Sequence, residues 1–254
     1  MTDVPIRHSR GRTERPAPSG KVAPGRRPSS WKRPLTLLAG GLLLIIAFGG
    51  LFQASLEVYH DRLVLTGLTV NPTPVPLTIG PENLVIPGNM LRFAKTRIGG
   101  PVERADIALY WPSLEGYSDR LAGPFKDGSP SAPIVYATIS ARDTPLDSTG
   151  RLDDVYARFF VDKPLPGPAG LVGRRLNQAS GYGGEIVYFV PAEPRPFVTR
   201  CLETATLDVP ATCLRDVNFG RSLSLLYRFN RDLLADWRAL DTGMQKLASG
   251  FLTP

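Results

Sequence analysis

Few side chains of this 254-residue chain combine the types and spacing that chemistry requires, and its two cysteines are the most distinctive. Cys201 and Cys213 have eleven residues between them. A thioredoxin-like redox pair usually has only about two, a structural zinc site needs roughly four Cys or His ligands, and a catalytic cysteine needs a histidine base. After the N-terminal region the only histidine is His60. The pattern therefore favours a structural disulfide, provided that the cysteines lie where disulfides persist.

Carboxylates are the other groups that could catalyse a reaction. An acid and a base for glycan hydrolysis could come from Glu115, Asp119, Asp153, Asp154 and Glu185. A domain of this size normally carries several such acids on its solvated surface, which is the interpretation we favour. The scarcity of histidine argues against a Ser-His-Asp triad or a His-rich metal site, and there is no P-loop or dinucleotide fingerprint. We assign no catalytic residue, metal or cofactor, and keep an enzyme with paired carboxylates as the alternative.

Aromatic residues gather in the segment LYWPSLEGYSDR, residues 109–120. Tyr110, Trp111 and Tyr117 lie around a proline and a glycine. Aromatic side chains on a rigid loop bind partners well, because they offer a large area with little entropy to lose. Aromatic side chains also dominate protein cores. The sequence leaves both roles open, and we take these three residues as the candidate binding site.

The first structural element expected along the chain is a long apolar segment. Residues 35–52, LTLLAGGLLLIIAFGGLF, contain no charged side chain. With a few flanking residues they are long enough to span a hydrocarbon core of about 30 Å. A cleaved signal peptide is the alternative, but its apolar core usually has only about 7 to 15 residues. Residues 34–54 are therefore predicted to form a retained transmembrane anchor.

Basic residues are concentrated before this anchor. Residues 1–33 hold nine Lys or Arg and two acids, whereas the rest of the chain has equal numbers of bases and acids. This asymmetry predicts a cytoplasmic N-terminus and an exported C-terminal region, where disulfides persist. The tail is predicted to be disordered and to bind anionic lipid headgroups. Nucleic-acid binding is disfavoured, because the folded region has no basic excess of its own.

The exported region is predicted to contain a spacer and one domain. Several prolines indicate an extended spacer, or an edge strand, within residues 55–81. Residues 82–254 alternate short apolar runs with turn signals, which is typical of strands. The predicted strands cover residues 84–87, 105–111, 134–141, 155–161, 185–190, 197–202 and 221–229. Two hairpins are expected, at residues 176–190 and 200–216, the second closed by the disulfide.

One helix is predicted after Asn230, which can cap it. Apolar residues from Leu233 to Phe251 recur at spacings of three and four, so they share one face. This face is expected to pack on the sheet, with docking onto a partner helix as the alternative. The fold class is therefore α+β: one N-terminal transmembrane helix, then a β-rich, mostly antiparallel domain with a C-terminal amphipathic helix.

Two segments that come after the anchor, LVIPGNMLRFAKTRIGG at residues 84–100 and LYWPSLEGYS at residues 109–118, add a resemblance. Together with the anchor they resemble uncharacterised single-pass membrane-anchored proteins of alphaproteobacteria. The resemblance implies a bacterial envelope and a periplasmic domain. It implies no activity and no site residue.

These expectations together predict a binding or scaffold protein of the bacterial cell envelope. It would be anchored in the inner membrane, with its N-terminus in the cytoplasm and its C-terminal domain in the periplasm. The expected partners are the lipid bilayer and an envelope protein. The alternatives are an envelope enzyme that uses paired carboxylates, and a cytoplasmic tether that binds nucleic acid through the basic tail.

A peptide of residues 1–33 should bind vesicles that contain anionic lipid and should be released as salt is added. Each Lys or Arg close to such a surface contributes about 1 kcal/mol, and salt screens that attraction. Vesicle co-sedimentation at low and high salt measures the effect, with neutral-lipid vesicles as the control. Equal binding to both kinds of vesicle would contradict the prediction.

Overall fold

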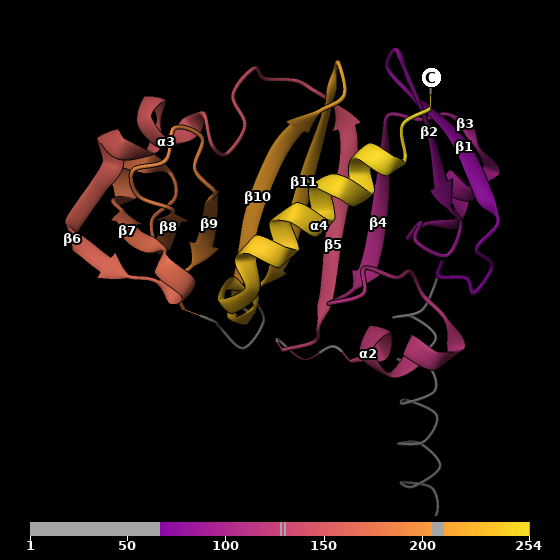
Figure 1. Ribbon diagram of the computed structural model, residues 1–254, viewed down its shortest axis with the longest axis horizontal. Coiled ribbons are helices and arrows are strands. Elements are labelled where there is room, and N and C mark those ends of the chain that lie inside the picture. The colour runs from indigo at the N-terminus through magenta and orange to yellow at the C-terminus, as the bar shows by residue number, and fades with distance from the viewer. Residues whose placement is uncertain (1–66, 128, 130, 205–210, 254) are drawn as a thin grey trace, which may run out of the picture. The chain divides into compact units, whose positions relative to one another are not determined.

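The computed structural model describes residues 67–127, 129, 131–204 and 211–253, which form two sheets and a helix that crosses the larger one (Figure 1). The predicted tail, the predicted anchor and the spacer up to residue 66 lie outside the described residues. No helix among the described residues is both long enough and apolar enough to cross a membrane. The β-rich, mostly antiparallel domain with a C-terminal helix is confirmed.

The larger sheet has eight strands in the order β4-β5-β11-β10-β9-β8-β7-β6, and all of its neighbours are antiparallel. Its strands are β4 (Arg104–Tyr110), β5 (Ile134–Ala141), β6 (Phe160–Pro166), β7 (Val172–Leu176), β8 (Glu185–Phe189), β9 (Val198–Leu202), β10 (Thr212–Phe219) and β11 (Leu223–Asn230). The smaller sheet has the order β2-β1-β3. Its strands are β1 (Pro74–Ile79), β2 (Glu82–Pro87) and β3 (Gly100–Pro101).

Helical segments connect or cover the strands. The α-helices are α2 (Ala122–Lys126), α3 (Arg151–Asp154) and α4 (Trp237–Gly250). The 3-10 turns are η1 (Ala94–Ile98), η2 (Asp119–Leu121), η3 (Tyr156–Phe159), η4 (Pro168–Gly170), η5 (Gln178–Ser180) and η6 (Arg231–Asp236). Among the helices of the described residues only α4 is long, and it is the predicted C-terminal helix.

The proline-rich stretch, for which a spacer or an edge strand was predicted within residues 55–81, contains a strand. Residues 74–79 form β1, in which Val75, Leu77 and Ile79 are buried and alternate with more exposed residues. The strand tolerates its prolines because β3 pairs only with Leu77 and Thr78, which leaves one edge of the first half of β1 without a ladder.

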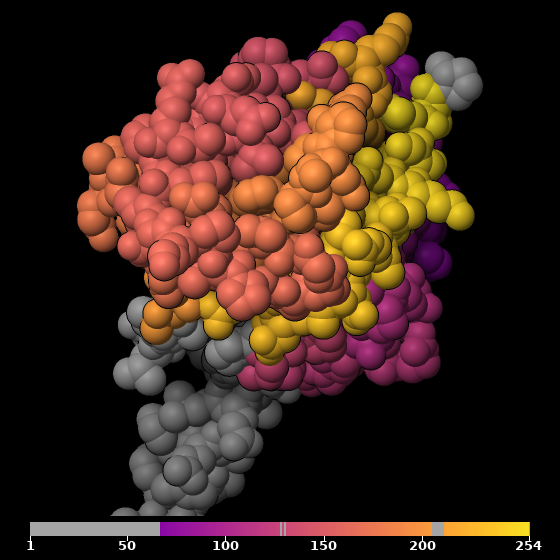
Figure 2. All heavy atoms as spheres, turned by 60° about the vertical axis from the view of Figure 1, so that its left-hand side comes forward, coloured from indigo at the N-terminus to yellow at the C-terminus, as the bar shows by residue number. Residues whose placement is uncertain are grey.

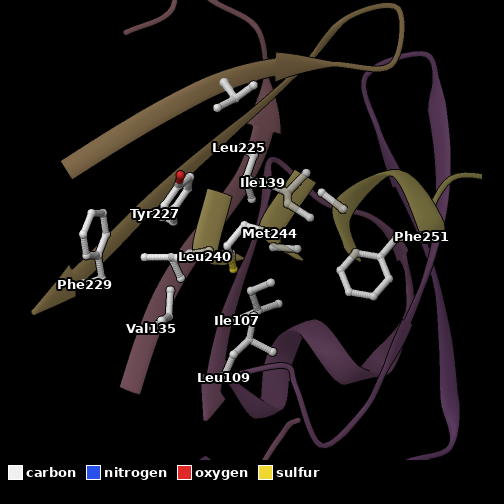
Figure 3. Close-up of a cluster of buried hydrophobic side chains, with 14 of the residues drawn as sticks. Ile107, Leu109, Val135, Ile139, Leu225, Tyr227, Phe229, Leu240, Met244 and Phe251 are labelled. Carbon is white, nitrogen blue, oxygen red and sulfur yellow. The ribbon is translucent and has the colours of Figure 1, made fainter. Parts of the chain in front are cut away.

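The C-terminal helix packs on the larger sheet, as its apolar spacing predicted. The Asn230 side chain caps its start by accepting a hydrogen bond from the Asp232 amide at 2.8 Å, although the first turns are the 3-10 segment η6. Leu240 and Met244 are completely buried. Figure 3 shows them among side chains of β4, β5 and β11, including Ile107, Val135, Ile139, Leu225 and Tyr227. The inner face of α4 is therefore occupied, which leaves no room there for a partner helix.

The strand predicted for residues 155–161 is wrong over its first part. Residues 156–159 form the turn η3, and β6 begins only at Phe160. The apolar run instead serves a second, smaller core, where Tyr156 packs with Leu152, Leu176, Val187 and Val198. An apolar run that fills a core from a turn has the same composition as a buried strand, so the run alone could not distinguish the two.

One buried carboxylate joins the two sheets. Glu82, at the start of β2, is 6 % exposed and accepts hydrogen bonds from the backbone amides of Arg221 at 2.7 Å and Ser222 at 2.6 Å, in the turn between β10 and β11. Burial alone would raise the pKa of this carboxyl, but these hydrogen bonds outweigh it and lower the pKa. Gly220 is required beside it, because φ is +58° and a Cβ would lie 2.9 Å from the Glu82 oxygens.

Glu82→Gln should remove a pH-dependent part of the stability. Because the folded pKa of Glu82 is lowered, its contribution is present above the unfolded value of about 4.3 and is lost as the pH falls through the folded value. The difference in the free energy of unfolding between wild type and Glu82→Gln, measured by urea unfolding, should therefore be larger at pH 7 than at pH 3. Glu103→Gln, at an exposed acid, is the control. A difference that does not depend on pH would contradict the prediction.

Candidate functional site

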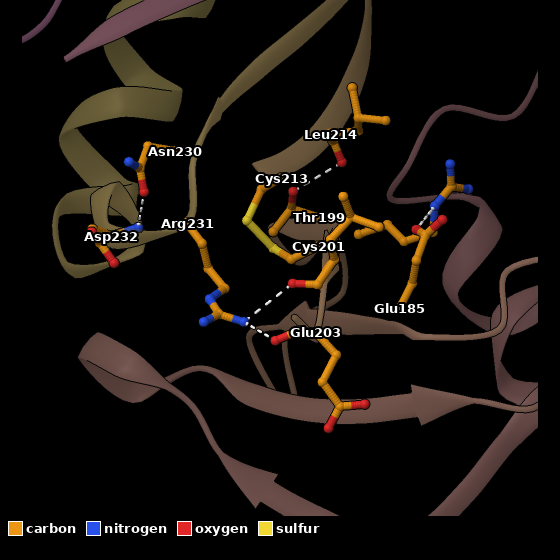
Figure 4. The surroundings of a disulfide bond; sticks show 11 residues. Glu185, Thr199, Cys201, Glu203, Cys213, Leu214, Asn230, Arg231 and Asp232 are labelled. Carbon is orange, nitrogen blue, oxygen red and sulfur yellow. Dashed lines mark hydrogen bonds and ion pairs between the residues drawn. A yellow bond between two sulfur atoms is a disulfide. The ribbon is translucent and has the colours of Figure 1, made fainter. Parts of the chain in front are cut away.

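The two cysteines form the predicted disulfide inside the predicted second hairpin (Figure 4). Cys201 of β9 stands directly opposite Cys213 of β10, and both are completely buried. Among the described residues the ladder between these strands has only two residue pairs, the fewest in the larger sheet, and the disulfide crosses it. The Thr199 hydroxyl adds a hydrogen bond to the Leu214 carbonyl oxygen at 2.9 Å. A bond so deeply buried is structural, because exchange needs access by a thiolate.

Trp111, the central residue of the predicted aromatic binding site, lies in the main core. Its exposed fraction is 9 %, and it belongs to the same cluster as Leu240 and Met244 of α4. Nearby, Leu114 packs on α4 so closely that a Cβ at Gly243 would lie 2.9 Å from its Cδ1. The glycine that weakens the helix locally thus permits this contact. The segment after β4 and the apolar face of α4, both considered as docking surfaces, are packed together.

Tyr110 and Tyr117 belong to a different cluster. They are partly buried around Leu121 and Phe125, and the rings of Tyr117 and Phe125 meet edge to face at 5.5 Å. This cluster covers one end of the sheet face that looks away from α4, where it includes Ala108 and Ile134. The structure therefore does not bring the three predicted aromatic residues together on one exposed surface. It favours the core role that the sequence left open.

The five acids considered for catalysis are also dispersed. Glu115 forms an ion pair with Arg120, and Glu185 forms one with Arg200. Asp119 begins the turn η2. Asp153 and Asp154 lie together beside a cleft of about 840 Å³ that also exposes acids and arginines of the neighbouring loops. No group of three or more potential metal ligands was found among the described residues.

A surface that the sequence analysis missed lies on the sheet face opposite α4. Alternation along β11 buries Leu225, Tyr227 and Phe229 against the helix and exposes Leu226 and Arg228 on the other side. With Tyr136 and Thr138 of β5, Asp106 of β4, Leu214 of β10 and Arg92, these residues line a hollow of about 210 Å³. We call this surface the open face. Leu226 is 43 % exposed, one of three large apolar residues so exposed among those described.

Two arginines on the open face share one aromatic ring. The guanidinium carbons of Arg92 and Arg228 lie 5.0 Å and 5.5 Å from the ring centroid of Tyr136, within cation–π range. Neither arginine forms an ion pair with any carboxylate of the described residues. By contrast, Arg104 on the same face binds Asp106, with Nε 3.1 Å from Oδ2. The open face therefore presents two unpaired positive charges beside an exposed leucine.

The sequence did contain a signal for this surface. In the run RSLSLLYRF the inward positions are all apolar, and Leu226 is an apolar residue among the outward polar ones. One exposed leucine needs no explanation by itself. Its position beside Arg92 and Tyr136 depends on pairing between strands far apart in the chain, which the local pattern does not determine.

The comparisons with known proteins concern the fold. No family model and no curated protein matches the chain. Smlt3025, an immunity protein of the Stenotrophomonas maltophilia type IV secretion system, is 14% identical over 75% of this chain and 98% of its own, with a TM-score of 0.51. The iron-regulated outer membrane lipoprotein FrpD of Neisseria meningitidis is 14% identical over 73% of this chain and 95% of its own, with a TM-score of 0.45. At such identities the first likeness establishes a shared fold only.

Trp111→Ala should destabilise the domain by about 3 to 5 kcal/mol, because it leaves a cavity in the main core. Leu226→Ala on the open face is the matched control and should change stability by less than about 0.5 kcal/mol. Urea unfolding of both variants measures the difference. If Trp111→Ala is as stable as the control, Trp111 is not a core residue and its binding role must be considered again.

Proposed function

We propose that this chain is a non-enzymatic binding protein of the bacterial cell envelope, whose β-rich domain binds a protein partner on the open face. The observation that carries the proposal is the group formed by Arg92, Tyr136, Arg228 and Leu226. Arginine and tyrosine are enriched among the residues that dominate binding energy at interfaces. Tyr136, Leu226 and Arg228 stand on the paired strands β5 and β11, which hold them rigidly and so reduce the entropy lost on binding. Arg92 precedes η1, and its backbone amide donates to the Asp106 carbonyl oxygen of β4.

The edges of the larger sheet make addition of a partner strand a poor alternative. β6 is one terminal strand, and it carries Lys163, Pro164 and Pro166 and loses its register between Val161 and Leu165. Charge, proline and irregular pairing all oppose edge-to-edge association. The other terminal strand, β4, is already bonded along its outer edge by the backbone of residues 90–92. A partner is therefore better accommodated on a sheet face than at an edge.

Several observations support an envelope location. The disulfide is of the kind that persists outside the cytoplasm. The apolar segment of residues 34–54, preceded by nine basic residues, has the character of an anchor that exports the region after it. We also propose that the tail of residues 1–33 binds anionic lipid headgroups. Smlt3025, which shares the fold, is an immunity protein of a secretion system, and an immunity role is one form of the proposed binding function.

Site-specific photocrosslinking in intact cells tests the proposal. A photoreactive amino acid at Ser224, on the open face two residues before Leu226, should capture a protein. The control position is Ala239, which is exposed on α4, on the opposite side of the sheet, where the helix surface is open to solvent in Figure 2. A captured protein at 224 and none at 239 is the expected result. Capture only at 239, or at neither position, would contradict the proposal.

A reporter fused after Pro254 tests the location. An enzyme that is active only in the periplasm should be active there in the full-length fusion. The same fusion without residues 34–54 should be inactive, since nothing would then export the domain. An inactive full-length fusion would refute the envelope location.

A further inference from the structure

The open face has more arginine side chains than carboxylates to pair with them. Of its three arginines only Arg104 has a carboxylate, that of Asp106, which also accepts a hydrogen bond from the Thr138 hydroxyl at 2.7 Å. Arg92 and Arg228 converge on the Tyr136 ring without a carboxylate from the described residues. Two like charges held near one another repel, and an anion between them would relieve the repulsion.

The geometry of these groups suits a carboxylate. The Tyr136 ring lies within cation–π range of both guanidinium groups and so restricts how they turn. A fixed planar guanidinium can give two parallel hydrogen bonds to a carboxylate. Pockets for small molecules usually hold about 300 to 1,000 Å³. The hollow of the open face, at about 210 Å³, is smaller than these. It has room for one or two side chains of a partner.

The exposed side chain of Leu226 lies at a fixed distance from the charged side chain of Arg228. Leu226 and Arg228 are two residues apart on β11 and point to the same side, so they are separated by roughly 7 Å along the strand. An extended segment that lies along β11 would match them with an acidic residue and an apolar residue two positions apart. A lipid headgroup or a nucleic-acid backbone would match the charges and leave Leu226 without a counterpart.

We propose that the open face recognises an acidic segment of the protein partner, in which an Asp or Glu binds Arg92 and Arg228 and an apolar residue two positions away packs on Leu226. This inference rests on the proposed function and specifies its partner. The Tyr136 ring restricts the orientation of the two guanidinium groups. Arg104 forms an ion pair with Asp106 and takes no direct part in binding.

The test uses the full-length protein in cells with the photoreactive amino acid at Ser224. The crosslinked peptide is sequenced by mass spectrometry and should contain an Asp or Glu with an apolar residue two positions away. The double variant Arg92→Gln, Arg228→Gln should lower the crosslink yield about tenfold, as expected when two exposed charge-assisted contacts are lost. Arg104→Gln, which leaves the two charges and the ring in place, should change the yield less than about twofold.

Charge reversal provides a second test that does not depend on loss of binding. Arg228→Glu should abolish the crosslink, and replacing the acidic residue of the captured segment with Lys should restore it. A captured segment without acidic residues, or a yield unchanged in the double variant, overturns the inference and leaves the proposed function standing. Capture of lipid alone at Ser224, or of nothing, overturns both. Unchanged melting temperatures of the variants exclude unfolding as the cause of a lower yield.

Discussion

The buried ion pair between Arg215 and Asp241 is the interaction on which the arrangement of this domain depends. Its side chains are 5% and 13% exposed, and Arg215 donates from Nε at 2.9 Å and from Nη2 at 3.2 Å to the two carboxylate oxygens. Arg215 also donates to the Val198 carbonyl oxygen at 2.9 Å, and the Tyr227 hydroxyl donates to Asp241 at 2.8 Å. The group thus joins α4 to β9, β10 and β11 at one point.

Such a pair specifies geometry more than it adds stability. Removing one partner of a buried pair typically costs about 3 to 5 kcal/mol, because the other charge stays buried without compensation. An apolar helix face could pack on the sheet in several registers, whereas the ion pair is satisfied in only one. Burial raises the pKa of Tyr227 well above its ordinary value, so the phenol keeps its proton and continues to donate to Asp241.

Fixing α4 on one face determines what the other face can do. The short helical segments cover the ends of that other face, α2 through the cluster around Phe125 and α3 through the ion pair of Arg151 with Asp216. Between these ends the strands β5 and β11 have no helix over them among the described residues, and the open face lies there. The disulfide joins β9 to β10, beside this uncovered region.

The sequence predicted those parts of the structure that local patterns determine. Alternation identified most strands, the spacing from Leu233 to Phe251 identified the helix, and the cysteine pair identified the disulfide. The Arg215–Asp241 pair was not predicted, because an arginine in a strand and an aspartate in a helix are ordinary surface residues until the fold brings them together. Trp111 was ambiguous for a related reason: a loop aromatic is buried or exposed according to what packs over it, and here that is α4.

The open face combines two arginines that have no ion pair among the described residues with an exposed leucine. Some arginines elsewhere are paired, as Arg151 is with Asp216 and Arg215 is with Asp241, and the strands place apolar residues inward. A sheet face that served only solubility would carry mixed, compensated charge. Two uncompensated arginines on one tyrosine, beside an exposed leucine, add nothing to the packing of α4. Local violations of otherwise consistent patterning tend to occur where a protein functions, so this is the surface at which we expect the domain to meet its partner.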